Sequence, residues 1–203
     1  PDPETVMNRS IAAAAVDALL SPDPDMRQYY HTANWRDGMS MAHRHDGAGS
    51  HYYVLQSGDS MALKVCRSRL SMGPDSLARL QRDPLESFSP LAVQVLKEPE
   101  FRYQELSFLA FSENGAPWQS LQFRVDNQTS DEMAEPILDM ICKGPKIFYL
   151  YGQSYHEITL DPTALKAMYA LQPLDEELAR TIAPEANLAE ARAELQRIGY
   201  PLA

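Results

Sequence analysis

Three of the five histidines of the chain lie in the stretch MAHRHDGAGSHYYV, which covers residues 41–54. His43 and His45 are two residues apart, so both side chains point to the same face of a β-strand. His51 follows a glycine-containing turn and can return opposite them on the next strand. Three neutral imidazoles on one face, with an open fourth position, match a catalytic zinc or iron site. The sequence therefore offers His43, His45 and His51 as ligands of a divalent metal, against the alternative of a hairpin with solvent-exposed histidines.

The glycines around this stretch allow two further comparisons. The order Gly38, His43, His45 and Gly58 partly resembles the first motif of the cupin family. The pair Gly47 and Gly49, followed by Lys64, resembles the nucleotide-binding lobe of a protein kinase. The acid position of the cupin motif falls on a glycine or a serine here, and the kinase catalytic-loop motifs are missing from the sequence. Neither family is assigned, and glycine also serves hairpin turns that need positive φ.

A second set of residues could form a nucleophilic site. Cys66 ends the predicted strand MALKVC, His156 opens the segment HEITL, and Asp161 follows that segment. This order of thiol, imidazole and carboxylate is that of papain-like cysteine hydrolases and some transferases. A cysteine in an apolar strand also behaves as a small buried hydrophobe. The sequence leaves both roles open for Cys66.

Composition limits the classes of partner. Acids outnumber bases by 28 to 18, which gives a formal net charge of -10. Such a charge repels a phosphate backbone, so no nucleic acid is expected to bind.

The two cysteines, Cys66 and Cys142, do not form a Cys-x-x-Cys pair, which favours a reducing compartment. The apolar run IAAAAVDALL is too short to span a bilayer, and neither a signal peptide nor a transmembrane segment is visible. We therefore expect a soluble protein, cytoplasmic or otherwise intracellular, with no membrane partner.

The first half of the chain predicts a leading helix followed by antiparallel strands. A helix over residues 3–20 places five apolar residues roughly along one side: Val6, Ile11, Ala14, Ala15 and Ala18. Glycine-containing turns then separate three predicted strands, 39–45, 51–56 and 61–67. Recurring prolines over 74–99 predict short helices, one near PDSLARL and another near SPLAVQVL.

The second half predicts a hairpin, a helix, another hairpin and a helical group. FRYQELSFLAF and QSLQFRV alternate in polarity on either side of the turn ENGAPW. SDEMAEPILDMICKG predicts a helix with a serine cap, in which Pro136 either produces a kink or lies near the beginning. KIFYLYGQSYHEITL predicts two strands about Gly152. Three helical segments follow: DPTALKAMYAL, LDEELARTI and NLAEARAELQRIG.

Together these elements predict one α+β domain over residues 1–203, with antiparallel hairpins in one or two small sheets, a leading helix and a C-terminal helical group. A division into two lobes near 74–99 is the alternative. Because no catalytic set outweighs its structural alternative, the leading hypothesis is an acidic protein-interaction module, such as an adaptor, an inhibitor or an effector-type protein. It would bind another protein through an aromatic or acidic surface, with tyrosine and tryptophan side chains as anchors. The alternative is an enzyme that uses either the three histidines or the cysteine set. No cofactor is expected unless the histidines hold a divalent metal, and the oligomeric state stays open.

Overall fold

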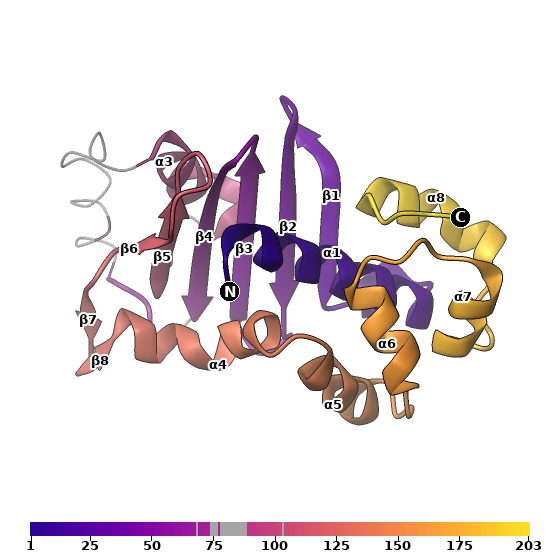
Figure 1. The fold of residues 1–203 in the computed structure, drawn as a ribbon. Coiled ribbons are helices and arrows are strands. Elements are labelled where there is room, and N and C mark those ends of the chain that lie inside the picture. Colours follow the sequence, from indigo (N-terminus) through magenta and orange to yellow (C-terminus); the bar gives the residue numbers. More distant parts are fainter. Residues whose placement is uncertain (68, 74–76, 78–88, 103) are drawn as a thin grey trace.

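The computed structural model describes residues 1–67, 69–73, 77, 89–102 and 104–203. In these ranges it confirms the predicted α+β class (Figure 1). A six-stranded antiparallel sheet has the order β1-β2-β3-β4-β5-β6, and β7 and β8 form a separate two-stranded sheet. The strands are β1 (Tyr29–Arg36), β2 (Met39–His45), β3 (Ser50–Ser57), β4 (Ser60–Arg67), β5 (Phe108–Ser112), β6 (Gln119–Ser120), β7 (Arg124–Val125) and β8 (Gln128–Thr129). The α-helices described are α1 (Pro3–Leu20), α3 (Pro90–Lys97), α4 (Ser130–Cys142), α5 (Pro145–Tyr155), α6 (Pro162–Tyr169), α7 (Glu176–Ile182) and α8 (Leu188–Ile198).

The strands predicted on either side of the histidine-containing turn are confirmed as β2, β3 and β4. A two-residue loop, Asp37 and Gly38, joins β1 to β2, and both residues have positive φ, at 49° and 77°. This conformation matches the right-handed twist of a tight hairpin and is favoured by an Asp-Gly pair. Strand β5 pairs with β4 beyond the proline-containing segment, so strands from both sides of 74–99 share one sheet. The predicted helix near PDSLARL lies outside the described residues apart from Leu77.

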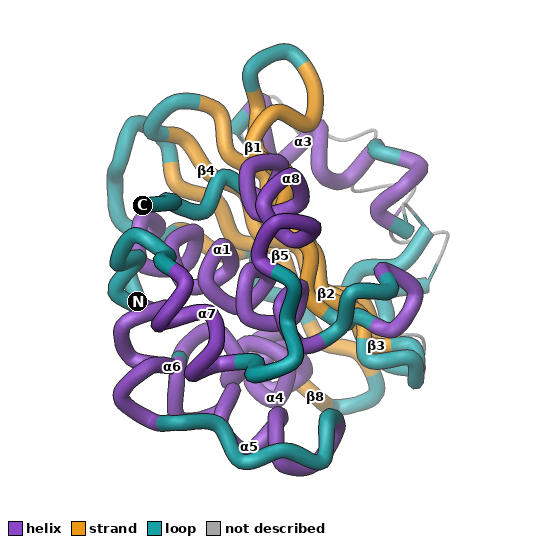
Figure 2. Tube along the Cα trace, turned by 90° about the vertical axis from the view of Figure 1, so that its right-hand side faces the viewer, coloured by secondary structure: helices purple, strands orange, loops and turns teal. Residues whose placement is uncertain are grey.

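Alternation along the strands gives the sheet two buried faces. Val54, Leu63 and Val65 belong to the face that packs on α1 and α4. Their neighbours Leu55, Ala62 and Cys66 belong to the opposite face, beneath α3. Figure 2 shows the sheet with α3 on one side and α1, α4, α6 and α7 on the other. The helix predicted near SPLAVQVL is α3, and the Ser89 hydroxyl caps it by accepting from the backbone N–H of Ala92 at 2.9 Å.

Helix α1 begins and ends where the sequence predicts, but its burial is wider than one side. Ala12, Ala14, Ala15 and Val16 are all fully buried. Helix α1 contacts β1 and β2, and it also contacts α4, α6, α7 and α8 (Figure 1). Alanine suits such a position because its small side chain lets elements approach closely and orders no rotamers. The helix therefore forms the centre of the core, and no amphipathic pattern of the usual kind marks it.

The segment KIFYLYGQSYHEITL is a correction to the sequence analysis. Residues 145–155 form helix α5, with no strand on either side of Gly152, and 156–160 are irregular. Pro145 occupies the first turn of α5, where its fixed φ suits a helix start. A Cβ on Gly152 would lie 2.8 Å from Leu160 Cδ1, so this glycine serves close packing inside a helix. The aromatic residues that suggested strands pack instead at helical spacing, with Phe148 and Tyr151 buried.

Helix α4 and the hairpin before it are confirmed with changes at their ends. The cap of α4 is Thr129 and not the predicted serine, and Thr129 forms a capping box with Glu132. Pro136 lies inside the helix. The predicted hairpin is reduced to the pairing of β5 with the two-residue β6, and residues 99–101 form the short helix η3 (Pro99–Phe101) instead of strand. The C-terminal helices α6, α7 and α8 match the prediction. No helix in the described part of the chain is long and apolar enough to cross a membrane.

Candidate functional site

The structure brings the three predicted metal ligands together on the α3 side of the sheet. His43 pairs with Tyr53 across β2 and β3, and His45 pairs with His51. The ring centroids of His43 and His45 lie 5.5 Å apart, those of His43 and His51 lie 5.9 Å apart, and those of His45 and His51 lie 6.1 Å apart. The three histidines are half-buried. We refer to His43, His45, His51, Tyr30 and Tyr53 as the histidine face.

The rings of the histidine face are stacked in a way that does not suit a shared metal. His43 lies between Tyr30 and Tyr53, with centroid distances of 5.4 and 4.8 Å. The planes of His43 and His51 are parallel within 2°. A metal bound by two imidazoles lies close to both ring planes, and parallel planes that are stacked do not meet. In the described part of the chain, no three His, Cys, Asp or Glu side chains are placed to hold a metal ion. Metal binding by His43, His45 and His51 stays a prediction, and it requires the rings to leave these stacks.

The environments of His43 and His51 favour neutral imidazoles. Burial, with smaller contributions from His45 and His51, lowers the pKa of His43 to about 3. Burial and the nearby Arg102 guanidinium lower the pKa of His51 to about 4. Arg102 Nη1 lies 3.1 Å from His51 Nε2, a geometry in which the guanidinium donates to the ring nitrogen. These rings therefore act as aromatic and hydrogen-bonding surface near neutral pH, and protonation works against the packing.

The second predicted set is not brought together. Cys66 is fully buried under η3, and its Sγ donates to the carbonyl oxygen of Glu105 at 3.3 Å. Burial raises the pKa of this thiol to about 12. His156 follows α5 on the opposite side of the sheet, where its Nε2 lies 2.8 Å from Asp17 Oδ1. Asp161 caps α6 by accepting from the backbone N–H groups of Thr163 and Ala164. In this arrangement Cys66 is a packed core residue, and His156 and Asp161 hold separate helix ends.

Asp17, which interrupts the apolar run of α1, has a role that the sequence analysis missed. Its carboxylate is fully buried. One oxygen accepts from the backbone N–H groups of Gln28 and Tyr29, at 2.8 and 2.9 Å, and the other lies next to His156. A buried carboxylate with several donors fixes the elements that carry them. Asp17 thus joins α1 to the start of β1 and the end of α5. In the sequence, the only signal of this role was an acidic residue within an apolar run of five alanines, two leucines, an isoleucine and a valine.

The largest exposed apolar side chains lie around α5. In the described residues these are Met26, Leu150 and Tyr155, with exposed fractions of 57%, 50% and 41%. The Tyr155 hydroxyl donates to the backbone oxygen of Met26 at 3.0 Å, which places the short helix η1 (Pro24–Met26) beside the end of α5. Leu150 lines a wide, shallow hollow with five other residues: Arg44, Ile147, Tyr151, Gln153 and Ser154. We call Met26, Ile147, Leu150, Tyr151 and Tyr155 the α5 outer face.

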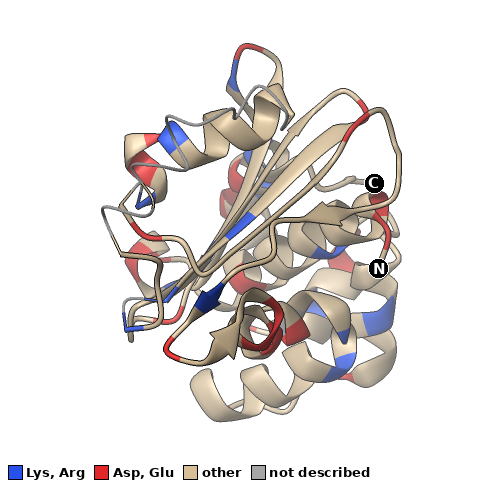
Figure 3. Cartoon of the chain, turned by 90° about the vertical axis from the view of Figure 1, so that its left-hand side faces the viewer, with Lys and Arg blue, Asp and Glu red and all other residues tan. Residues whose placement is uncertain are grey.

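The charge around α5 differs from that of the whole chain. Residues 143–155 contain two lysines and no acid, within a chain of net charge -10. Elsewhere basic and acidic residues are interspersed over the helices and loops, and the strands carry few charges (Figure 3). Along α5 the outer face is therefore apolar and aromatic with basic and neutral polar neighbours, whereas exposed Asp25 lies next to Met26 and exposed Glu157 follows the helix. Comparison of the chain with protein-family models, with curated proteins and with solved structures found no match.

Proposed function

We propose that this protein is an interaction module that binds another protein through the α5 outer face. The observation that carries the proposal is that exposed Met26 and Tyr155 lie side by side, next to exposed Leu150 on the same helix. Single exposed apolar side chains are common, whereas a contiguous group of them marks an interaction site. Aromatic and aliphatic side chains that are half-exposed and surrounded by polar groups are typical anchors of protein interfaces.

The geometry of α5 supports this use of the helix. At 3.6 residues per turn, Ile147, Leu150 and Tyr155 fall within an arc of about 140°. The ring of Tyr151 stacks on the ring of Tyr155, with their centroids 5.1 Å apart. On its other side, toward the core, the Tyr151 ring contacts Phe148. The Tyr155 ring is therefore held in place before a partner binds. Anchors that are ordered in advance lose less conformational entropy on binding.

An enzymatic function has less support. Cys66, His156 and Asp161 lie on separate elements, and Cys66 is buried with a raised pKa. The three histidines lie together but are stacked. Neither set provides a nucleophile next to a base, or ligands that converge on one point.

Site-specific photo-crosslinking tests the proposal. A p-benzoylphenylalanine replaces Leu150 on the α5 outer face, and a control protein carries it in place of Ala193, an exposed residue of α8. Both proteins are irradiated in extracts of cells that produce the chain. We expect a discrete adduct from position 150 that is missing from position 193 and is lost when Tyr155→Asp is added. An adduct of twice the protein's mass identifies a second copy as the partner. No adduct, or the same adducts from both positions, overturns the proposal.

A further inference from the structure

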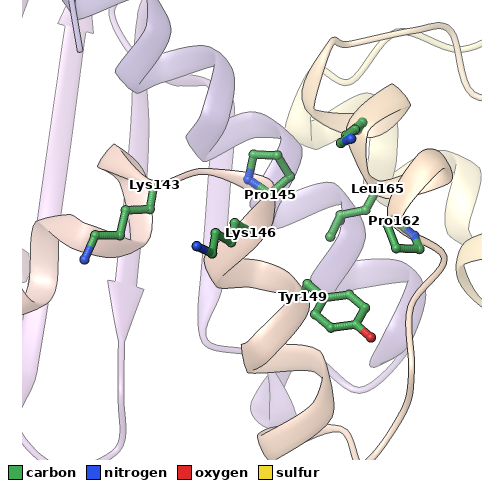
Figure 4. Close-up of a pocket in the computed structure, with 7 residues that line it drawn as sticks. Lys143, Pro145, Lys146, Tyr149, Pro162 and Leu165 are labelled. Atoms are coloured by element: carbon green, nitrogen blue, oxygen red, sulfur yellow. The ribbon is translucent and has the colours of Figure 1, made fainter.

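A separate pocket lies on the other side of α5, where the beginning of α5 meets α6. Its volume is about 400 Å³, within the range of small-molecule sites. The lining comes from the α4–α5 junction, α5 and α6 (Figure 4). The residues are Lys143, Pro145, Lys146, Tyr149, Pro162, Leu165 and Lys166.

The walls of this pocket are largely apolar. Leu165 is buried and Tyr149 is half-buried, and Figure 4 shows them near Pro162 on the α6 side of the pocket. Pro145 and Pro162 occupy the first turns of their helices, where a proline removes a backbone N–H that would otherwise need an acceptor. The pocket therefore offers contact area to an aliphatic or aromatic group.

The rim of the pocket is basic. The chain has five lysines, and three of them line this one pocket together with no acid. Lys143 forms an ion pair with Asp139. Among the described residues no carboxylate pairs with Lys146 or Lys166, and both are exposed. Lys146 and Lys166 contribute mainly their methylene chains to the walls, and in Figure 4 the Lys146 ammonium group is directed away from Tyr149 and Leu165. Both side chains are exposed and long, so their ammonium groups can turn toward an anion at the mouth of the pocket.

The amino end of α5 adds to this positive field. The cap residue Gly144 has no side chain to accept from the first backbone N–H groups of the helix, whereas Asp161 supplies such an acceptor for α6. Pro145 has no N–H, however, and the N–H of Ile147 donates to the Gly144 carbonyl oxygen at 3.1 Å, so this end of α5 adds only a small positive field. The lysines and this helix end lie at the same pocket and favour the same sign of ligand charge.

We propose that this pocket binds an amphipathic organic anion. The apolar body of the ligand lies on Tyr149 and Leu165, and its carboxylate, sulfonate or phosphate head meets Lys146 and Lys166. This inference goes beyond the interaction function, because the pocket uses a different side of α5 from Leu150 and Tyr155.

A matched pair of fluorescent probes separates the two parts of this recognition. The anion 8-anilinonaphthalene-1-sulfonate and neutral N-phenyl-1-naphthylamine share the same apolar body. The tested variants are a double variant, Lys146→Glu with Lys166→Glu, and a control, Lys97→Glu, which changes an exposed lysine on α3. Circular dichroism and thermal unfolding confirm that each variant folds.

We expect the wild type to bind one equivalent of the anionic probe. The double variant should bind it at least about tenfold more weakly, which corresponds to roughly 1.4 kcal/mol. The control and a Leu150→Ser variant should bind it as the wild type does. The neutral probe should respond to Tyr149→Ala but not to the lysine changes. Equal affinity of the wild type and the double variant for the anionic probe, binding that does not saturate at one equivalent, or an equal response to Lys97→Glu would overturn the proposal.

Discussion

The stacked position of His43 predicts that the protein loses stability in mild acid. The ring lies between Tyr30 and Tyr53, and in the described part of the chain no group hydrogen-bonds to its buried Nε2. Protonation would place a charge and an unsatisfied N–H in this stack, next to two other imidazoles. The pKa of His43 is accordingly lowered to about 3, from the ordinary 6.5.

The direction of the effect follows from which state binds the proton. Between pH 6.5 and the lowered pKa, the unfolded chain protonates His43 and the folded protein does not, so acid favours unfolding. A pH of about 5 lies about 1.5 units below the pKa of His43 in the unfolded chain. Protonation of the unfolded chain therefore lowers the free energy of unfolding by roughly 2 kcal/mol relative to about pH 7.5. This magnitude depends on the unfolded pKa alone, provided that the folded pKa lies below about 4. It is a substantial part of the roughly 5–15 kcal/mol that stabilises a typical domain.

The variant His43→Phe isolates this contribution, because phenylalanine keeps an aromatic ring in the stack and does not titrate. Urea unfolding of both proteins at about pH 7.5 and about pH 5 gives the difference in unfolding free energy at each pH. Acidic and other titrating groups common to both proteins largely cancel in this difference. We expect the difference to move by roughly 2 kcal/mol in favour of the variant on acidification. A difference constant within about 0.5 kcal/mol, or an NMR titration of the His43 ring near its ordinary pKa, would refute the reasoning.

Three other predictions concern the core. Asp17→Ala removes the acceptor of two buried backbone N–H groups, and denaturant unfolding should show a loss of at least about 3 kcal/mol, with a smaller loss for Asp17→Asn. Gly152→Ala brings a methyl group within 2.8 Å of Leu160, so thermal unfolding should show a loss of roughly 1–3 kcal/mol, and an unchanged midpoint would contradict the close packing. In the native protein a thiol reagent should react with one cysteine, Cys142, whereas buried Cys66 should react only after unfolding. Two fast-reacting thiols in the native state would show that Cys66 is accessible.

The sequence predicted elements well where local patterns and tertiary packing agree. The turn glycines and alternating strands of residues 39–67 identified β2, β3 and β4, and the acids and asparagine before the C-terminal helices identified their beginnings. Helix α5 was mispredicted because Ile147, Tyr149 and Tyr151 favour strands locally, while the structure packs this segment on α1 and α6. Tertiary packing overrode the local preference, and Gly152 was taken for a turn residue when it provides room for Leu160.

The candidate sites also depend on tertiary packing that local sequence patterns do not report. Strand alternation and one short turn sufficed to bring His43, His45 and His51 together, because the register of a hairpin is a local property. The ring planes depend on stacking with Tyr30 and Tyr53, which the spacing of the histidines does not report. The α5 outer face and the lysine pocket were not predicted at all, because they arise where α5 meets η1 and α6, and α5 itself was expected to be strand.

The central position of α1 has a consequence for the order in which the chain assembles. Helix α1 precedes every element that buries it, and its contacts extend to α8, more than 160 residues later. Contacts between such distant segments close large loops, which slows folding. While the chain is being synthesised, the alanine-rich surface of α1 has the sheet to pack against before the helical group exists. Full burial of α1 waits for Leu195 and Ile198, so α8, which is synthesised much later than α1, completes the environment of α1.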